Sequence, residues 1–345
     1  MEPIVVKAEA LSNYAQCVLM KAGLKKEDAR IVADTLVEAN LRGVDTHGIV
    51  RLPLYYLKRI KKGLINTDPD YRVIKKSHST AVVDADGGPG QVATLRAMEL
   101  AIEMAKNSGI GLVTIKNSSH FGMAAYFAMK ALERDMIGIA MTQADSRVAP
   151  FGARKAYLGT NPLAIAIPAE KHFPIVLDMA TSVTSMGSII LAAMEEREIP
   201  EGLAIDENGH ATTDPKRVAA LLPVGGPKGS GLAIIIDILC GILTESNFGN
   251  HIHRGDDFSK PEKLGHLVGA INIASFCDPV KFKHRIDQMI SEIKSLPPAP
   301  GFDEILLPGE REFKTKEERL KKGIPIPQEF FEKLQRLEGC YLETD

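Results

Sequence analysis

The sequence predicts a mixed α/β fold with helical segments at both ends of the chain. STAVVDAD is typical of a strand, GGPGQ of a turn, residues 92–108 of an amphipathic helix and GIGLVTIKN of the next strand. A strand-rich middle follows, in which turn residues separate the short apolar runs IGIAMT, PLAIAIP and PIVLDMA. The first sixty residues instead carry apolar side chains at helical spacing.

Individual helices follow from their stop signals and periodicity. At the N-terminus, Gly23 ends one helix, a second covers 28–40, and a third covers 53–62 before Gly63. Further helices are expected at 185–196, 230–246, 278–296 and 328–337, with a late strand at 265–275. The apolar run 232–243 is too short for a membrane helix, which needs about twenty residues, and is interpreted as a buried core helix.

Composition favours a globular protein with small-molecule partners. The 345 residues are 45% hydrophobic and 25% charged, and the net charge of -2 gives no field suited to nucleic acid or a membrane surface. The four cysteines are far apart and form no C-x-x-C pair, which argues against a disulfide framework and a zinc knuckle and favours a reducing compartment. With no secretory signal visible, a cytoplasmic location is expected.

Residues 88–93 match the dinucleotide fingerprint G-x-G-x-x-A between a strand and a helix. The next strand, however, ends in Lys116 and Asn117 and not in the acidic residue that holds a ribose in Rossmann domains. Pro89 also crowds the loop, so we interpret it as an ordinary turn. On this interpretation Gly90→Ala costs only stability, whereas in a Rossmann site it would abolish cofactor binding.

Polar residues in loops suggest acid–base chemistry on a carboxylic acid. His47 lies in the loop RGVDTHGIVR with Arg51 four residues later, and a histidine suits proton transfer while an arginine fork suits a carboxylate. His120 directly follows a strand, and Asp178 ends another. Either histidine can instead be inert or structural, and the carboxylate of Asp178 needs a partner, whether a histidine or an amide.

Other motifs carry weaker signals. Lys228 precedes a helix, where its ammonium and free N–H groups attract phosphate or carboxylate, but the spacing is not that of a Walker A motif. The turn 159–162 can place side chains against a ligand. His251 and His253 form an H-x-H pair without a nearby third ligand, so no metal is predicted. No G-x-S-x-G elbow supports a serine hydrolase.

Six segments together resemble the malate/L-lactate dehydrogenase type-2 family, which includes ureidoglycolate and sulfolactate dehydrogenases and reductases of diketogulonate and cyclic imino acids. They are VDTHGIVR (44–51), NSSHFG (117–122), PFGARKAYLGTNPLAIAIP (150–168), VLDMATS (176–182), LLPVGGPKGSGL (221–232) and APGFDEILLPGE (299–310). The resemblance implies an L-sulfolactate-dehydrogenase-like, non-Rossmann fold and a homodimer. One lobe is expected over 1–118 plus 265–345, and a strand-rich cofactor lobe over 119–264.

The resemblance also implies roles for individual residues. His47 is expected at the substrate oxygen with Thr46 and Asp178 as relay partners, His120 is a second acid–base residue, and which histidine leads stays open. The residues implied in substrate binding are Arg51, Tyr55, Thr160 and Asn161. Those implied in cofactor binding are Ala144, Asp178, Met179, Ala180, Lys228, Gly229, Pro308, Gly309 and Glu310. Two departures weaken the pattern, because Thr46 replaces the usual serine and Ala144 stands where relatives carry a hydroxyl or amide.

The expected function is an NAD- or NADP-dependent dehydrogenase of a small 2-hydroxy or 2-oxo acid. The short joint TTDPKRVAALLPVGGPKG and the stretch SLPPAPGFDE resemble those of ureidoglycolate dehydrogenases more than those of malate-type members, and this resemblance implies ureidoglycolate as the leading substrate. Malate, L-lactate and sulfolactate are alternatives, as is the reduction of a sugar or cyclic imino acid. Outside the enzyme class, the alternative is a dinucleotide-binding sensor without turnover.

Overall fold

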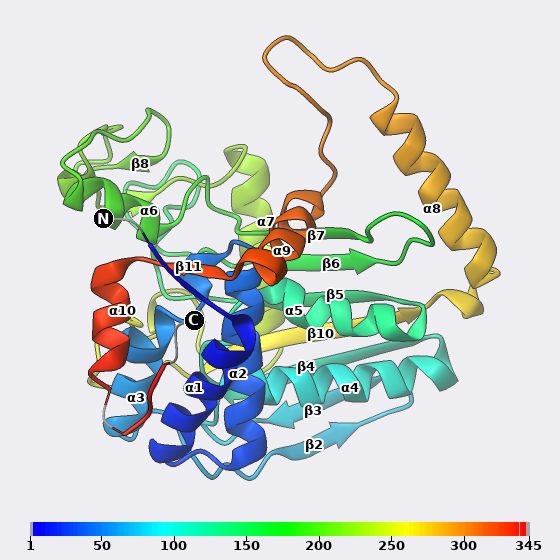
Figure 1. The fold of residues 1–345 in the computed structure, drawn as a ribbon, viewed down its shortest axis with the longest axis horizontal. Helices are drawn as coiled ribbons and strands as arrows, with labels where there is room; N and C mark the ends of the chain where they lie inside the picture. The colour runs from blue at the N-terminus through cyan, green and yellow to red at the C-terminus, as the bar shows by residue number, and fades with distance from the viewer. Residues whose placement is uncertain (1–2, 338, 343–345) are drawn as a thin grey trace.

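The fold is organised around one seven-stranded sheet, in a computed structural model that describes residues 3–337 and 339–342. The strand order is β2-β3-β4-β10-β5-β6-β7 (Figure 1). These strands are β2 (Arg72–Lys76), β3 (Thr80–Asp84), β4 (Ile110–Ser118), β5 (Met136–Thr142), β6 (Leu163–Ile167), β7 (Ile175–Met179) and β10 (Leu264–Asn272).

Only β3 and β4 pair in parallel, joined by helix α4 (Gly90–Ser108), and every other neighbouring pair in this sheet is antiparallel. The predicted strand–helix–strand unit is therefore confirmed, with α4 ending at Gly109 in the left-handed region at φ +80°. Because a Rossmann domain needs a mostly parallel sheet with helices on both faces, this topology is a different, mixed α/β fold.

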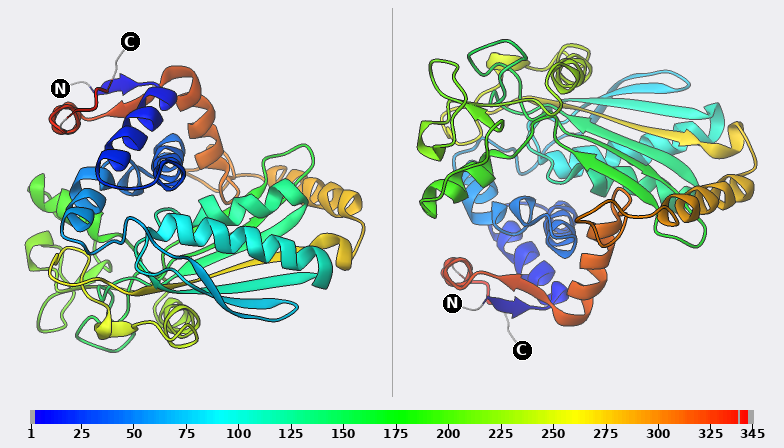
Figure 2. Two further views of the ribbon diagram at one scale, coloured as in Figure 1. Left: turned by 90° about the horizontal axis from the view of Figure 1, so that it is seen from below. Right: turned by 90° about the horizontal axis from the view of Figure 1, so that it is seen from above.

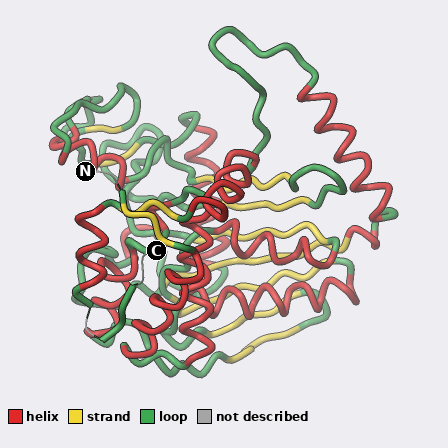
Figure 3. Tube along the Cα trace, in the orientation of Figure 1, coloured by secondary structure: helices red, strands yellow, loops and turns green. Residues whose placement is uncertain are grey.

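Helices cover the two sheet faces unequally (Figures 2 and 3). On one face lie α4 and α5 (Ala124–Ala128), with α1 (Ala8–Lys21) and α2 (Lys26–Leu41) packed outside them. The main hydrophobic core fills the space between these layers. On the other face lies α7 (Pro227–Asp237), continued by a π-helical turn over Ile238–Ile242. None of the helices that the structure describes has the length and apolar character of a membrane span.

The remaining elements surround this framework. They are β1 (Ile4–Val6), α3 (Leu57–Lys61), α6 (Met186–Met194), β8 (Ala204–Ile205), β9 (Ala220–Leu221), α8 (Pro279–Lys294), α9 (Glu310–Lys322), β11 (Ile324–Ile326) and α10 (Gln328–Gln335). Asp278 caps α8 by accepting hydrogen bonds from Val280 and Lys281 backbone N–H groups. The chain then returns along a long loop to α9, beside β7 (Figure 1).

The prediction that α7 is a buried core helix is wrong for the single chain. Ile236 and Cys240 pack on Leu267 of the sheet. The opposite side exposes more than a third of each of five apolar side chains: Ile234, Ile235, Ile238, Ile242 and Leu243. An apolar run indicates that a helix is covered, but it does not say whether the cover comes from the same chain.

The expectation of no disulfide is also wrong, because Cys17 of α1 and Cys340 are bonded. Their separation of 323 residues hid the pair from a reading of local spacing. The two ends of the chain meet because β1 pairs with β11, Ile4 lying opposite Ile326. Cys240 and Cys277 stay free, the first buried and the second exposed.

Loss of this disulfide is expected to lower the free energy of unfolding by about 3 kcal/mol, because the bond restricts the unfolded chain. Denaturant unfolding of Cys17→Ser should show the loss, and reduction of the unsubstituted protein should reproduce it. Cys277→Ser, which removes an exposed free thiol, is the matched control and should be neutral. Equal stability of Cys17→Ser and the unsubstituted protein would contradict the prediction.

The expected division into two lobes stays a prediction. Both segments supply strands to the same sheet, since β2, β3, β4 and almost all of β10 belong to one and β5, β6 and β7 to the other. Within the second segment, α6 and β8 lie at one end of the molecule, and the connection between β6 and β7 lies at the other (Figure 1).

Candidate active site

Two histidines stack on each other at the end of the sheet. His47 closes a 3-10 turn over Asp45–His47, and His120 follows β4 by two residues. Their ring centroids lie 5.6 Å apart with an interplanar angle of 18°. Asn40 at the end of α2 fixes the first loop, because its side-chain oxygen accepts a hydrogen bond from the Ile49 N–H at 2.7 Å. The fold thus brings together two residues separated by 73 positions in the chain.

Both rings are neutral at physiological pH. Burial, and then the nearby Arg51 guanidinium, lowers the pKa of His47 to about 4. The same causes, with His47 itself, hold the pKa of His120 well below its usual value. Each of the two histidine residues nevertheless keeps part of its surface exposed, so neither residue is fully enclosed by protein. The Nδ1 atom of His47 lies 3.1 Å from the Thr46 hydroxyl oxygen, which leaves Nε2 as the free nitrogen.

Arg51 presents an unpaired guanidinium beside these rings. Its Nε donates to the Thr46 carbonyl oxygen at 2.7 Å, which fixes the base of the fork. Within residues 3–337 and 339–342, no carboxylate forms an ion pair with this arginine. A partly buried cation without a counter-ion is a site for an anion, and a planar fork favours a carboxylate.

A layer of buried polar side chains lies behind the histidines, and Tyr55 is its only member among the predicted site residues. Tyr56 lies 2.8 Å from His120 Nδ1 through its hydroxyl oxygen, and Tyr55 donates its hydroxyl to Glu262. Arg59 is fully buried, with its Nε 3.7 Å from Glu262. Burial raises the pKa of Glu262 to about 7. Glu262 lies in a charged loop whose composition gives no sign of burial. The π-helical turn over Leu52–Tyr56 buries both tyrosines.

A cavity of about 670 Å³, here called the His47 cavity, opens in front of His47. It runs from the Thr46–His47 turn past α5 and the end of β7 to the loop before α9. Eight residues from the predicted set line it: Thr46, His47, Thr160, Asp178, Met179, Ala180, Pro308 and Gly309. Three charged residues absent from that set line it as well: Arg42, Arg311 and Glu312.

Asp178 projects into this cavity from β7. One carboxylate oxygen accepts a hydrogen bond from the Ala125 backbone N–H at 2.9 Å. Burial raises the pKa of Asp178 to about 6, although the cavity leaves much of the side chain accessible. No hydrogen bond joins it to His47 in the described part of the chain. The relay between Asp178 and His47 therefore stays a prediction without a direct contact.

The other predicted residues, among them Arg51, Tyr55 and His120 beside His47, are not part of the wall of the His47 cavity. Asn161 is fully buried, and its amide joins Ala144 N to Ala233 O, each at 3.0 Å, so it positions Ala144. Lys228 is exposed near the start of α7, and an added Cβ on Gly229 would lie 2.0 Å from the Val224 carbonyl oxygen. Both residues lie in the first turn of α7, which begins three residues before the predicted helix, so Lys228 is part of the helix that it was expected to precede.

Glu310 begins α9 and points into an adjacent hollow of about 140 Å³. Its carboxylate accepts hydrogen bonds from Lys294 at 2.6 Å and from the Leu307 N–H at 3.2 Å. It thereby shapes the loop whose Pro308 accepts a hydrogen bond from Val176 N, next to the cavity. The roles of Glu310, Lys228 and Gly229 toward a cofactor stay predictions.

The glycine-rich segment 88–93 supports the His120 loop. The N–H of Gly90 donates to the Ser119 hydroxyl at 3.1 Å, and that hydroxyl donates to the Gly88 carbonyl oxygen at 3.0 Å. A Cβ on Gly90 would lie 2.0 Å from the Ser119 carbonyl oxygen and 2.7 Å from that of His120. Gly88 and Pro89 lead into α4, which begins at Gly90, two residues before the predicted start, and Gly90 allows this helix to touch the active-site loop.

The remaining histidines of interest lie elsewhere. His266 is fully buried between Thr142, at 2.6 Å, and Ser118, at 2.9 Å, and is structural. His253 lies 2.9 Å from Asp257, and His251 contacts Phe248. No group of three or more potential metal ligands occurs in residues 3–337 and 339–342.

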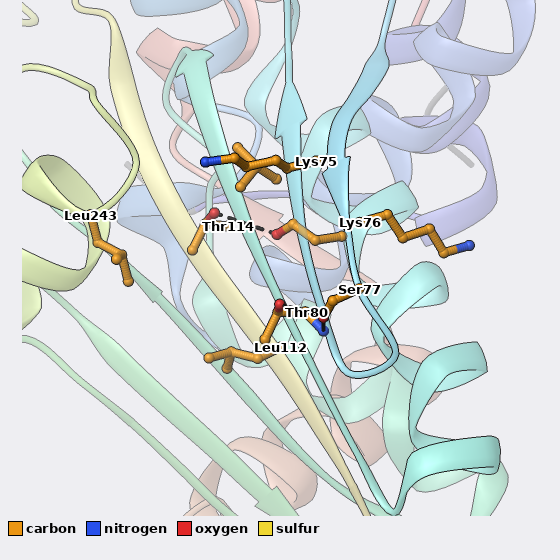
Figure 4. Close-up of a pocket in the computed structure, with 9 residues that line it drawn as sticks. Lys75, Lys76, Ser77, Thr80, Leu112, Thr114 and Leu243 are labelled. Carbon is orange, nitrogen blue, oxygen red and sulfur yellow. Dashed lines mark hydrogen bonds between the residues drawn. The ribbon is translucent and has the colours of Figure 1, made fainter.

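A second hollow of about 320 Å³ lies on the open face of the sheet (Figure 4). Side chains of β2, β3 and β4, among them Lys75, Thr80, Leu112 and Thr114, line it together with Leu243. It contains none of the predicted site residues. Its walls are mainly apolar, and they continue the exposed apolar side of α7.

Comparisons with known proteins match this fold and its motifs over nearly the whole chain. Malate dehydrogenase from Pyrococcus horikoshii is 43% identical over 344 residues, covering 97% of this chain and 94% of that protein. Ureidoglycolate dehydrogenase (NAD(+)) from Escherichia coli is 38% identical, covering 95% and 94%. The solved structure of sulfolactate dehydrogenase from Methanocaldococcus jannaschii superposes with a TM-score of 0.91 at 41% identity, covering 97% and 96%. The model of the malate/L-lactate dehydrogenase family matches residues 6–335, and the chain belongs to that family.

Proposed function

We propose that this dehydrogenase transfers a hydride between NAD or NADP and a small 2-hydroxy or 2-oxo acid at the His47 cavity. The observation that carries the proposal is the unpaired guanidinium of Arg51 beside two stacked, neutral histidines. An anion binder close to a proton acceptor is what the oxidation of a hydroxy acid requires. The family relationship supplies the reaction class, and this cluster supplies the residues.

Within this proposal Arg51 holds the substrate carboxylate, and His47 exchanges the proton of the hydroxyl group through its free Nε2. Thr46 orients the ring from the Nδ1 side. Tyr55, whose ring centroid lies 5.3 Å from that of His120, closes the back of the pocket against water. Excluding water strengthens the attraction between Arg51 and the carboxylate, because the local dielectric falls.

The walls of the His47 cavity fit a dinucleotide. Gly309 allows the α9 loop to touch β7, because an added Cβ would lie 2.9 Å from Val176. Asp178 keeps one carboxylate oxygen available for a hydroxyl donor, and Met179 and Ala180 supply apolar contact area. When bound, the nicotinamide gives or accepts the hydride. We propose either NAD or NADP, since both cations and carboxylates line the cavity.

The rate of oxidation is expected to fall at acidic pH and that of reduction at alkaline pH. Oxidation needs neutral His47, whose pKa of about 4 in the free enzyme keeps it neutral at higher pH. The ratio kcat/KM for oxidation should therefore be level above about pH 5 and fall toward pH 4. For reduction, which needs the protonated ring, kcat/KM should fall about tenfold per pH unit above that pKa. An acidic limb for oxidation near the ordinary histidine pKa would contradict this.

Ureidoglycolate is the proposed substrate, with malate, L-lactate and sulfolactate as alternatives, and a sugar acid or cyclic imino acid after these. The test is the nicotinamide absorbance of purified enzyme with NADH or NADPH and oxaloacetate, pyruvate or sulfopyruvate, together with the oxidation of ureidoglycolate. Turnover of one acid supports the proposal and identifies the substrate. Cofactor binding without turnover of any of these acids, or of a sugar acid or cyclic imino acid, would support a sensor instead.

We also propose that the enzyme is a homodimer. Ile234, Ile235 and Ile238 expose an apolar helix face that continues into the hollow of Figure 4, and monomers rarely expose apolar patches of this kind. A second copy of the chain that covers α7 would explain why the apolar run 232–243 has the composition of a buried core helix. Light scattering after gel filtration should give twice the mass of one chain, and Ile238→Glu should shift the protein toward the monomer. A monomeric parent protein would overturn this proposal.

The cytoplasmic location likewise stays a proposal. A disulfide such as Cys17–Cys340 is uncommon in the cytoplasm except in hyperthermophiles, so this bond is the observation that weighs against the location. Fractionation of the source cells, followed by trapping of free thiols, tests both points together. Enzyme found outside the cytoplasm would reject the location.

A further inference from the structure

Tyr56 contacts the histidine pair from the side away from His47. It ends the π-helical turn over Leu52–Tyr56, and only 2% of its surface is exposed. Its hydroxyl oxygen lies 2.8 Å from Nδ1 of His120. That contact occupies one nitrogen of the ring and leaves Nε2, on the other side, as the nitrogen available to a ligand.

The direction of this hydrogen bond follows from the protonation of its two partners. Burial raises the pKa of the Tyr56 phenol above its usual value, so the phenol keeps its proton. Burial, and then Arg51, lowers the pKa of His120, so the ring is neutral and has one nitrogen with a lone pair. In residues 3–337 and 339–342, Nδ1 of His120 is the partner of the Tyr56 hydroxyl at normal hydrogen-bond geometry, and the nearby Gln91 amide lowers the pKa of the phenol, as a donor to its oxygen does. A buried hydroxyl without an acceptor is costly, so Tyr56 donates and Nδ1 accepts.

We propose that Tyr56 is a positioning residue, which keeps the His120 proton on Nε2 and thereby leaves the role of base to His47. The inference rests on the proposed function and assigns the two histidines different tasks. His120 donates an Nε2–H hydrogen bond to the substrate oxygen and keeps its proton. His47 accepts the hydroxyl proton at Nε2, the nitrogen that faces away from Thr46.

A buried amide adjoins this arrangement. Gln91, the second residue of α4, is fully buried, and neither its nitrogen nor its oxygen has a hydrogen-bond partner of normal geometry in the described chain. It lies close enough to the Tyr56 phenol to influence its pKa. Gln91 is therefore placed to restrain the phenol as it donates to His120.

Nuclear magnetic resonance of the full-length enzyme with 15N-labelled histidines tests the proton position directly. The His120 signals, identified by their loss in His120→Gln, should report a neutral ring protonated on Nε2. In Tyr56→Phe they should shift toward a mixture of the two neutral forms. Tyr55→Phe is the matched control, because its hydroxyl donates to Glu262 and its loss should leave the His120 signals unchanged. A His120 ring protonated on Nδ1 in the parent enzyme would overturn the proposal.

The pH dependence of kcat/KM is a second test, because it should not change if Tyr56 has only a structural role. The charged and titratable groups around His120 are Arg51, His47, His266, Arg59, Tyr55 and Tyr56. Without the Tyr56 hydroxyl, the neutral ring can hold its proton on Nδ1, which removes the Nε2–H that bonds the substrate oxygen. Protonation of the ring at acidic pH restores that Nε2–H, so the loss of kcat/KM for oxidation should be smaller at acidic pH than at neutral pH. We expect Tyr56→Phe to lower kcat about tenfold, the cost of one misplaced hydrogen bond, with little change in KM.

An unchanged pH profile in folded Tyr56→Phe would overturn the proposal. The proposed dehydrogenase function and the proposed role of Tyr56 can fail separately. If no hydroxy acid is oxidised while His120 carries its proton on Nε2, the proposed function fails. If turnover is normal while His120 carries its proton on Nδ1, only the assignment to Tyr56 fails.

Discussion

Replacing Gly90 by alanine is expected to destabilise the protein by about 4 kcal/mol, at the upper end of single-substitution effects. The added Cβ would lie 2.0 Å from the Ser119 carbonyl oxygen, and neither backbone is free to move. The start of α4 would have to separate from the loop that carries His120. Denaturant unfolding measures the loss.

The folded fraction of Gly90→Ala should also turn over its substrate more slowly. The added Cβ would lie 2.7 Å from the His120 carbonyl oxygen and would displace the loop that carries this histidine. Cofactor binding should persist, since Gly90 does not line the His47 cavity. This goes beyond the expectation of a pure stability loss. Gly187→Ala, whose Cβ meets Ser185 at an ordinary 3.6 Å, is the control and should be neutral in stability. Loss of cofactor binding in folded Gly90→Ala would favour a phosphate-binding loop.

Replacing His47 by alanine is expected to lower kcat about 10³-fold, within the range for removal of a general base. The substitution deletes the nitrogen that exchanges the substrate proton but leaves Arg51, which Thr46 holds through its backbone oxygen. The KM for the acid should therefore change little. Steady-state kinetics in both directions measure the effect.

His78→Ala is the matched control for this substitution. His78 lies in the exposed turn between β2 and β3, outside the His47 cavity. Its loss should leave kcat, KM and stability unchanged. If His47→Ala kept most of the activity of the parent enzyme, His120 would be the base, and the assignment of roles would be reversed.

Sequence patterns predicted those parts of the fold that depend on local periodicity. The unit β3-α4-β4, the strands β5 to β7 and the helix α6 all lie where apolar spacing and turn residues indicated them. The short strands β1 and β11 were missed because three residues carry no periodicity, and their pairing depends on the chain ends meeting. The Cys17–Cys340 bond was missed for the same reason.

The site was only partly predictable. His47 and Arg51 stand four residues apart in a polar loop, so their proximity is local. His120 and Asp178 were indicated by their positions at strand ends, and the family resemblance added their expected roles. Tyr56 and Glu262 carry no such signal, because tyrosine in an apolar helix and glutamate in a charged loop are ordinary. They become functional candidates only when tertiary folding buries a phenol against His120 and a carboxylate against Arg59.

The most direct test of the account follows a labelled hydride. NADH carrying deuterium at the transferring position of the nicotinamide C4 is incubated with the enzyme and the accepted 2-oxo acid, and the product is analysed by mass spectrometry. The account predicts a hydroxy acid with one deuterium at C2, formed by the parent enzyme and by His78→Ala, and scarcely by His47→Ala. A product without deuterium, or equal labelling by His47→Ala, would contradict hydride transfer at the His47 cavity.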